Sequence, residues 1–214
     1  MSTSKLVTRK SSHSIMTDTD SSDDSVKHHK SWIASFLEQP SSDWFCDVPV
    51  SFANDSFNTY GLRIDQNYAK SAFMQLLGSE TESSFDSDSE DEIEKTTENI
   101  FGLVHARYIF TPEGLQKMYM KYVNGVFGTC PRYKCSGHHL LPVGISDLPG
   151  VDTVKLYCSN CKQIYEADPQ HRHLDGAYFT KSFPHYLFME LKSKKLSNMD
   201  PMLTSESHDG KFWH

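Results

Sequence analysis

The sequence predicts an α+β protein in which an all-helical N-terminal domain precedes a four-cysteine zinc-ribbon domain with a C-terminal helix and tail. Apolar residues recur at helical spacing through much of residues 31–128. Residues 129–191 instead carry four cysteines in two close pairs, beside two short β-rich runs. Polar segments at residues 1–30 and 192–214 flank these regions. We therefore expect two folded units between two tails.

Composition bounds the size of the core and the class of partner. The chain has 214 residues, 37% of them hydrophobic, which is enough for one or two small domains. A formal net charge of −7 argues against nucleic acid as the main partner. No apolar run approaches the ~20 residues of a membrane span, and the N-terminus lacks the apolar stretch of a signal peptide. Thiols that hold a metal fit a reducing compartment, so we expect cytoplasm and nucleus.

The first 30 residues are rich in Ser, Thr, Asp, Lys and His and contain few apolar groups. They cannot bury enough surface to offset the entropy of ordering, so we predict disorder. Thr17 and Ser21 each precede an aspartate by three positions, the pattern that acidophilic Ser/Thr kinases prefer. Both are candidate phosphorylation sites; a merely polar tail is the equally weighted alternative.

The first helix is expected at residues 31–37. Ser31 is the N-cap candidate, one face of the segment is apolar, and Pro40 stops it. The aromatic run at residues 44–48 is predicted to be buried. Cys46 within it has no accompanying base motif, so we interpret it as a small buried hydrophobe rather than a nucleophile.

A second helix is predicted at residues 67–77, and an acidic run follows it. Such a block repels itself and is expected to stay extended as a loop over residues 80–94. Two interpretations remain open, a solvated linker or a sink for polyamines and basic proteins. Phosphorylation at Ser83, Ser87 or Ser89, each with an acid three residues on, would make the loop more negative. The acids are Glu80, Glu82, Asp86, Asp88, Glu90, Asp91, Glu92 and Glu94.

Residues 93–124 predict two helices with an apolar stripe each. Thr111 followed by Pro112 marks the break, since threonine caps a helix and proline suits its first position. His105 lies within the first stripe, where a lone histidine is more often a hydrogen-bonded core residue than a ligand or base. Residues 124–128 form a linker to the cysteine-rich region.

The four cysteines form two knuckles, Cys130-x4-Cys135 and Cys158-x2-Cys161. Two short knuckles deliver the four soft ligands of a tetrahedral zinc ion in pairs. Four thiolates fill the coordination shell, so the predicted cofactor is one structural Zn²⁺ per chain, and folding depends on it. Unpaired core cysteines or two disulfides are the alternatives.

Residues 140–145 and 153–157 are predicted strands, joined by a turn at 146–150. Residues 175–191 are expected to form a final helix that is interrupted near Pro184. The tail that follows ends in Phe212-Trp213, which suggests a docking peptide.

Several segments together resemble the regulatory beta subunit family of casein kinase II, over roughly residues 31–191. The segments that carry the resemblance are Ser31-Trp32-Ile33, Phe45-Cys46-Asp47-Val48, residues 102–109, Cys130-Pro131-Arg132, residues 141–150, residues 154–158, residues 175–179 and Phe183-Pro184-His185.

This resemblance implies a non-catalytic protein whose zinc ribbons pair into a homodimer. The dimer then bridges two casein kinase II catalytic subunits and modulates their stability, activity and substrate choice. It implies that Cys130, Cys135, Cys158 and Cys161 bind zinc and that Pro131, Tyr133 and Ile164 face the dimer partner. It also relates the acidic loop to the family's polyamine-responsive loop.

The kinase-docking tail is where the chain departs from the family. The family carries an aromatic, a glycine and a phenylalanine in close succession, whereas residues 209–212 here read Asp-Gly-Lys-Phe. Replacing a buried aromatic anchor by Asp209 could cost several kcal/mol, on the order of a hot-spot loss. Trp213 is a candidate replacement, and Tyr186 matches another contact position. A paralogue that dimerises but docks the kinase weakly is therefore an alternative.

The sequence offers two weaker functional alternatives. A nucleic-acid-binding zinc ribbon would use Arg132, Lys134, Lys155, Lys162 and Arg172, but the net charge and the acidic run oppose it. A zinc hydrolase would use His138-His139 or His171 and His173. It lacks a His-Glu-x-x-His motif, and the cysteines already account for the metal.

Overall fold

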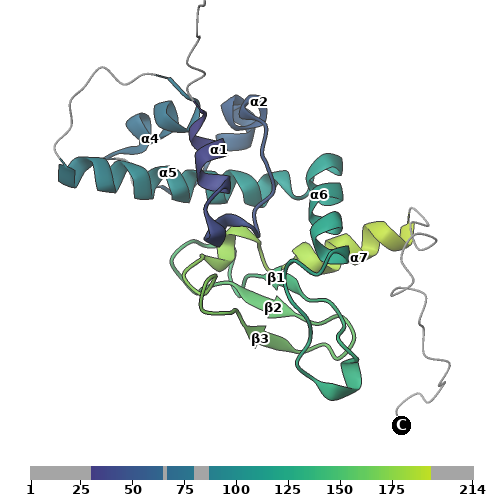
Figure 1. The fold of residues 1–214 in the computed structure, drawn as a ribbon. Helices are drawn as coiled ribbons and strands as arrows, with labels where there is room; N and C mark the ends of the chain where they lie inside the picture. The colour runs from purple at the N-terminus through teal and green to yellow at the C-terminus, as the bar shows by residue number, and fades with distance from the viewer. Residues whose placement is uncertain (1–29, 65–66, 80–86, 194–214) are drawn as a thin grey trace, which may run out of the picture.

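The computed structural model describes residues 30–64, 67–79 and 87–193. Helices make up the N-terminal part and a small sheet with a last helix makes up the ribbon part (Figure 1). The helical part contains α1 (Trp32–Leu37), the 3-10 turn η1 (Pro40–Ser42), α2 (Val50–Asn54), α3 (Ser56–Thr59), α4 (Ala69–Leu76), α5 (Ser87–Tyr108) and α6 (Pro112–Val123). The ribbon contains η2 (Tyr133–Cys135), β1 (Leu141–Val143), β2 (Lys155–Tyr157), β3 (Ile164–Glu166), η3 (Gly176–Tyr178) and α7 (Phe183–Ser193).

The helix starts follow the predicted capping chemistry. The Ser31 hydroxyl accepts a hydrogen bond from the Ala34 amide at 3.3 Å, and the Thr111 hydroxyl accepts one from the Gly114 amide at 3.1 Å. α4 falls inside the predicted segment 67–77. The short helices α2 and α3 were not predicted, because four or five residues cannot show a helical period.

The prediction of an extended acidic loop up to residue 94 was wrong for its second half. α5 begins at Ser87, so Asp88, Glu90, Asp91, Glu92 and Glu94 lie in its first turns. Carboxylates are stabilised near a helix N-terminus by the exposed amides and the helix dipole, which offsets their mutual repulsion. Glu80, Glu82, Ser83 and Asp86 lie outside the described residues.

Within the acidic run, Glu94 connects helices through hydrogen bonds. Its carboxylate accepts the Trp32 indole N–H at 2.9 and 3.0 Å and the Gln75 amide at 2.8 Å. Gln75 also accepts a hydrogen bond from the Thr97 hydroxyl. The start of α5 is thereby tied to α1 and α4.

The ribbon is built on a three-stranded antiparallel sheet in the order β1-β2-β3. Leu141 pairs with Tyr157, and Tyr157 pairs with Ile164 on its other side. β1 and β2 lie in the predicted runs. β3 was missed, because three residues directly after a knuckle are too few to show alternation.

The predicted helix over residues 175–191 is interrupted, as expected, but before Pro184 rather than at it. η3 and α7 are separate, and Thr180 between them has a φ of 56°. Pro184 does not interrupt a helix; it lies in the first turn of α7, where its missing N–H would have no intrahelical partner.

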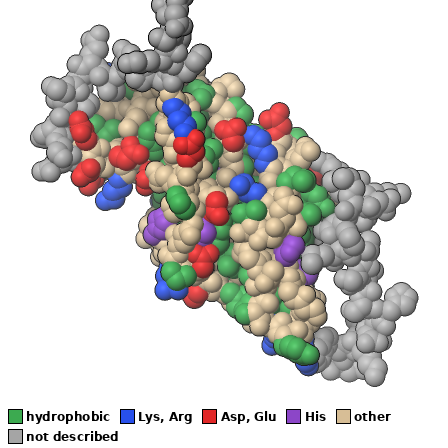
Figure 2. Space-filling view, viewed as in Figure 1, with side chains coloured by type: hydrophobic (Ala, Val, Ile, Leu, Met, Phe, Trp, Pro, Cys, Tyr) green, Lys and Arg blue, Asp and Glu red, His purple; other side chains and the backbone are tan. Residues whose placement is uncertain are grey.

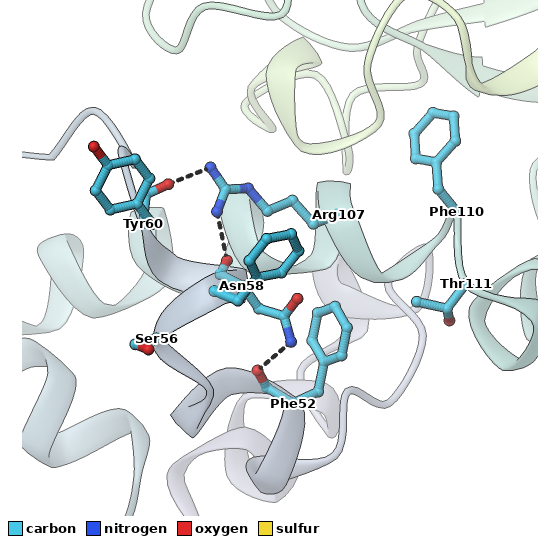
Figure 3. Close-up of a pocket in the computed structure, with 8 residues that line it drawn as sticks. Phe52, Ser56, Asn58, Tyr60, Arg107, Phe110 and Thr111 are labelled. Atoms are coloured by element: carbon cyan, nitrogen blue, oxygen red, sulfur yellow. Dashed lines mark hydrogen bonds between the residues drawn. The ribbon is translucent and has the colours of Figure 1, made fainter.

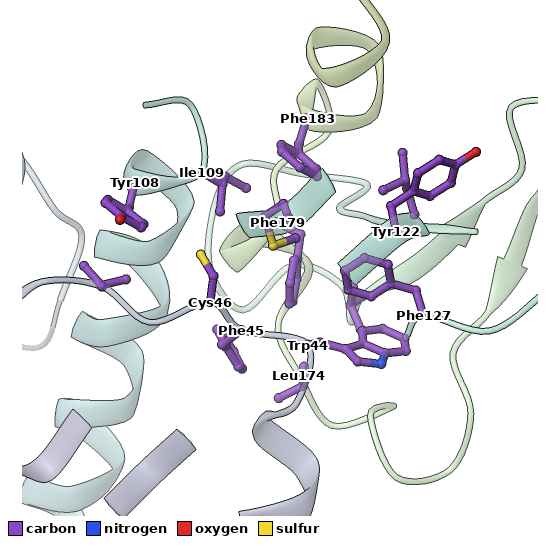
Figure 4. Close-up of a cluster of buried hydrophobic side chains, with 14 of the residues drawn as sticks. Trp44, Phe45, Cys46, Tyr108, Ile109, Tyr122, Phe127, Leu174, Phe179 and Phe183 are labelled. Carbon is purple, nitrogen blue, oxygen red and sulfur yellow. The ribbon is translucent and has the colours of Figure 1, made fainter. Parts of the chain in front are cut away.

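One continuous cluster of buried residues joins the helical part to the ribbon. Figure 4 shows Trp44 and Phe45 reaching from the helical part towards Phe179 of the ribbon. The ring centroids of Phe45 and Phe179 are 5.3 Å apart. Gly102 allows α5 to pack closely against η3, because a Cβ at this position would lie 2.4 Å from the Tyr178 ring. We call this contact region the seam; the predicted division of the chain at residue 128 stays a prediction.

His105 is a hydrogen-bonded core residue in the seam, as predicted. It is fully buried, its Nε2 accepts the Cys46 amide at 3.2 Å, and its Nδ1 donates to the Tyr178 carbonyl at 3.0 Å. Burial lowers its pKa to about 4, so the ring is neutral near pH 7. Cys46 is buried too, and burial raises the pKa of its thiol to about 12, as expected of an unreactive hydrophobe. Among the described residues, no helix combines the length and apolar character of a membrane span.

Candidate metal centre

The first knuckle is closed by its own backbone. The Cys130 amide donates to the His138 carbonyl at 2.8 Å, and the His138 amide donates to the Cys135 carbonyl at 3.0 Å. Ser136 (φ 49°) and Gly137 (φ 74°) take left-handed conformations that reverse the chain after η2. The reversal turns both cysteine side chains towards the same point.

The second knuckle repeats this geometry between β2 and β3. The Lys162 amide donates to the Cys158 carbonyl at 2.9 Å, and the Cys158 amide donates to the Gln163 carbonyl at 3.0 Å. Lys162 supplies the left-handed residue, with a φ of 59°. The strands thus deliver the second pair of thiols to the first.

The four predicted ligands come together. The Sγ atoms of Cys130, Cys135, Cys158 and Cys161 all lie within 4.8 Å of one another, and all four cysteines are free. Cys130 and Cys161 are 3.8 Å apart at sulfur, and Cys135 and Cys158 are 4.0 Å apart. Tetrahedral Zn–S bonds of about 2.3 Å would separate the sulfurs by about 3.8 Å. The cluster has the dimensions of a four-thiolate metal site, not of disulfides.

Tyr165 of β3 lies beside two of the ligands. Its hydroxyl is 3.5 Å from the sulfur of Cys130 and 3.3 Å from that of Cys161. A hydroxyl in this place can donate to a thiolate and orient it. We did not predict this residue, although its position four residues after the last cysteine, on the strand leaving the knuckle, was a usable signal.

The thiols differ in how readily they ionise. Burial raises the pKa of Cys158 to about 12 and also raises that of Cys135. Burial acts in the same direction on Cys161, but hydrogen bonds from the Tyr165 hydroxyl and the Gln163 amide outweigh it and lower the pKa to about 6. A bound cation would favour deprotonation of all four thiols.

The predicted dimer residues are on the surface. Tyr133 is 96% exposed and Ile164 is 50% exposed, and Pro131 is exposed as well. Tyr133 belongs to the first knuckle and Ile164 to β3. An exposed tyrosine and isoleucine on the ribbon are available to a partner surface.

Of the predicted kinase-docking residues, the structure describes only Tyr186. Tyr186 in α7 is partly buried, with its ring 4.9 Å from that of Phe110 and its hydroxyl 3.5 Å from the Phe110 carbonyl. Phe212 and Trp213 lie outside the described residues, as do the candidate phosphorylation sites Thr17 and Ser21. Ser87 and Ser89 lie in the first turn of α5.

Three residues of the alternative functions, Lys155, His138 and His171, have partners within the chain. The Lys155 ammonium pairs with Glu166 at 3.0 Å and with Asp152 at 3.2 Å, so it is not presented to a phosphate backbone. Both ring nitrogens of His171 face carboxylates, and His138 Nε2 lies 2.7 Å from the Ser159 hydroxyl. Within the described residues, the four-cysteine cluster is the group with metal-binding geometry.

A surface hollow between α2, α3 and the end of α5 carries no acid–base pair. Arg107 beside it donates to the Asn58 and Tyr60 carbonyls at 2.7 Å each (Figure 3). Its lining is aromatic and hydroxylic, with Phe52, Ser56, Phe57, Asn58, Tyr60, Arg107, Phe110 and Thr111. The guanidinium holds α3 against α5.

Comparison with known proteins identifies the family of this chain. A family model described as "Casein kinase II regulatory subunit" matches residues 31–208. The matched region includes the helical part, both knuckles and α7. It covers more than half of the chain.

Curated relatives support the same assignment. Casein kinase II subunit beta-2 of Neurospora crassa is 39% identical over 173 residues, which are 80% of this chain and 59% of the relative. Casein kinase II subunit beta' of Drosophila melanogaster is 39% identical over 176 residues, 82% of this chain and 77% of the relative. Casein kinase II subunit beta of Schizosaccharomyces pombe is 41% identical over 159 residues, 73% of this chain and 68% of the relative. The chain thus spans from about three fifths to three quarters of these relatives, and it belongs to the casein kinase II regulatory subunit family.

Proposed function

We propose that this chain is a non-catalytic regulatory subunit of the Ser/Thr protein kinase casein kinase II. It would form a zinc-dependent homodimer, bind catalytic subunits, and modulate their stability, activity and substrate choice. The observation that carries the proposal is the family match over residues 31–208, with the four-cysteine cluster inside it. The basis for the kinase as partner is the name of the family and of the relatives.

The proposed metal is a structural Zn²⁺ held by Cys130, Cys135, Cys158 and Cys161. The sulfur separations support a tetrahedral ion, and four thiolates leave no coordination position for a substrate or water. The ion's contribution is therefore to fold the two knuckles rather than to take part in a reaction. Thiolate ligands also suit a reducing compartment such as cytoplasm or nucleus.

Dimerisation is proposed through the ribbon. Tyr133, Ile164 and Pro131 are exposed, and a symmetric interface would bury the same apolar patch on both protomers. The metal fixes the knuckle that carries Tyr133, so pairing would depend on zinc.

Basic effectors are proposed to bind the exposed acids at the start of α5. Glu90, Asp91 and Glu92 are exposed, and acidic side chains gather on the side of the molecule where α5 begins (Figure 2). Ser83, Ser87, Ser89, Thr17 and Ser21 are proposed phosphorylation sites on the basis of the acid three positions on. Phosphate there would add to the negative field and strengthen attraction for polyamines or basic proteins.

Calorimetric titration of the zinc-loaded full chain with a casein kinase II catalytic subunit tests the proposal. We expect binding that weakens at least about tenfold in Phe212→Ala and in Trp213→Ala, as for truncated aromatic anchors. Phe57→Ala is the matched control, because Phe57 is 84% exposed on α3 and far along the chain from the tail. Absence of binding by a folded, zinc-loaded dimer would contradict kinase docking and favour the paralogue that only dimerises.

A further inference from the structure

His171 lies in the seam with a carboxylate at each ring nitrogen. Nε2 is 2.5 Å from an oxygen of Asp43, and Nδ1 is 2.8 and 2.9 Å from the two carboxylate oxygens of Asp168. The side chain is 6% exposed. The ring also stacks on Trp44, with centroids 4.1 Å apart and planes 9° apart. Asp43 and Trp44 follow η1, whereas Asp168 and His171 follow β3, so the contact joins the helical part to the ribbon.

This arrangement calls for a protonated ring. An ionised carboxylate only accepts hydrogen bonds, and a neutral imidazole has a single N–H to donate. A neutral ring would leave a nitrogen lone pair facing a carboxylate oxygen. The imidazolium donates at both nitrogens, and its charge is also favoured over the indole face.

The carboxylates behave as partners of a cation. Burial would raise the pKa of Asp168, but the hydrogen bond and charge of His171 outweigh it, and the pKa lies below its ordinary value. The Asp43 and Asp168 side chains are each 50% exposed, so the buried ring can exchange protons with solvent through them.

Other charged and hydrogen-bonding groups lie near the His171 ring. Lys121 of α6 donates to the Asp43 carbonyl at 2.7 Å, and the exposed Arg172 follows His171 along the loop. Gln170 donates to the Pro40 carbonyl, a neutral bond between the same two segments. That bond and the Trp44 stack do not depend on protonation, so deprotonation of His171 would loosen the seam locally rather than separate the two parts.

We propose that His171 is a proton-dependent clamp between the helical part and the ribbon, closed when its ring is protonated and loosened when the ring is neutral. This inference goes beyond the proposed function, since it needs neither kinase nor dimer. Histidine is the side chain that changes charge near neutral pH. The clamp is therefore closed by the charged ring and loosens when rising pH removes the proton.

The zinc-loaded full chain is the sample for the test. Ring ¹⁵N spectra recorded over a pH series should show both nitrogens of His171 protonated in the closed clamp and one protonated in the loosened clamp. Amide exchange, corrected for the intrinsic pH effect, should show residues 43–46 and 168–174 opening about five- to tenfold more at the high-pH end of the series. That factor is the expected gap between a charge-assisted and a neutral hydrogen bond.

Asp43→Asn separates the clamp from a general loss of packing. Its amide can donate to Nε2 of the neutral ring while Nδ1–H stays on Asp168, so the seam should remain protected and lose most of its pH dependence. Asp47→Asn is the control, because Asp47 is an exposed carboxylate in the same segment and contacts Lys117 instead. It should keep the dependence of the parent chain.

Zinc content is measured at both ends of the pH series, because loss of zinc in acid would open the ribbon. That pH dependence is opposite to the one expected of the clamp, which loosens as the pH rises. A His171 ring with the same protonation across the series would overturn the clamp. Equal seam exchange at the two ends of the series, or an Asp43→Asn chain as pH-dependent as its parent, would do the same.

Discussion

The helical part and the ribbon are stabilised by different means. In the helical part, aromatic side chains of α1, α5 and the segment after η1 pack on one another, with Phe36 and Phe101 centroids 5.1 Å apart and Phe45 and Phe101 5.6 Å apart. The ribbon has strands of three residues each and gathers four cysteines at one end of its sheet. A sheet this small buries little apolar area, so the proposed zinc and the seam would supply the stability that the strands do not. Removing the metal should therefore affect the two parts unequally.

The largest expected effect comes from the metal. Chelation, or Cys158→Ser, should unfold both knuckles and abolish dimerisation, while α1, α4 and α5 stay folded, because structural zinc contributes on the order of 10 kcal/mol. Amide exchange by mass spectrometry reports each part separately. Cys46→Ser is the control, since Cys46 is buried but outside the cluster, and it should keep a full complement of zinc. A ribbon that stays protected without metal would remove the distinction between the two parts.

The second largest effect on stability is expected from a substitution in the seam. His105→Phe leaves the Cys46 amide and the Tyr178 carbonyl without their partner, which should lower the free energy of unfolding by about 2–4 kcal/mol. Urea denaturation measures it, and His173→Phe, at an exposed position, should change little. A loss below about 0.5 kcal/mol would mean that the two hydrogen bonds contribute nothing net to the seam.

The same residue predicts a pH effect with a defined sign. In the folded chain the pKa of His105 is about 4, below the ordinary value of about 6.5. As the pH falls from 6.5 to 4, the unfolded chain binds a proton that the folded chain does not, so stability falls by about 3 kcal/mol. The comparison is between urea midpoints at pH 7 and pH 4.5. His105→Phe should lose less stability over this interval than its parent, and an equal loss would assign the effect to other groups.

A substitution at Tyr165 tests whether its hydroxyl strengthens zinc binding by the ribbon. Tyr165→Phe removes the hydroxyl beside Cys130 and Cys161, and we expect zinc affinity to fall roughly tenfold with the sheet intact. Competition with a chromophoric chelator measures the affinity. Tyr157→Phe on the neighbouring strand is the matched control, and equal affinities in the two variants would mean that the Tyr165 hydroxyl does not support the ligands.

The smallest effect on stability is expected at the start of α5. Replacing Glu90, Asp91 and Glu92 by glutamine should remove most polyamine binding and change stability by less than about 1 kcal/mol, since all three are exposed. Glu94→Gln should instead cost about 1–2 kcal/mol, because charged acceptors of the Trp32 and Gln75 hydrogen bonds are lost. Calorimetry with spermine and urea denaturation give the two readouts. Polyamine binding that survives the triple change would place the effector site elsewhere.

The sequence predicts features that depend on neighbouring residues better than features that depend on distant partners. The convergence of Cys130, Cys135, Cys158 and Cys161 and the caps Ser31 and Thr111 were predicted correctly, because their chemistry is local and depends on spacing alone; zinc as the ion they hold stays a prediction. Features that depend on distant partners were not predicted. The hydrogen bonds from Trp32 and Gln75 hold Glu94 in a helix, and both donors are far from Glu94 in the chain. The pairing of His171 with Asp43 spans 128 residues and leaves no local pattern.

The proposed role rests on an assembly of zinc, two copies of this chain and a kinase. Native mass spectrometry of the full chain mixed with a casein kinase II catalytic subunit counts all three at once. We predict a complex with two copies of this chain, one zinc per copy and two catalytic subunits, which falls apart when zinc is removed. A zinc-loaded dimer that carries no catalytic subunit, or a kinase complex that persists without zinc, would contradict the account.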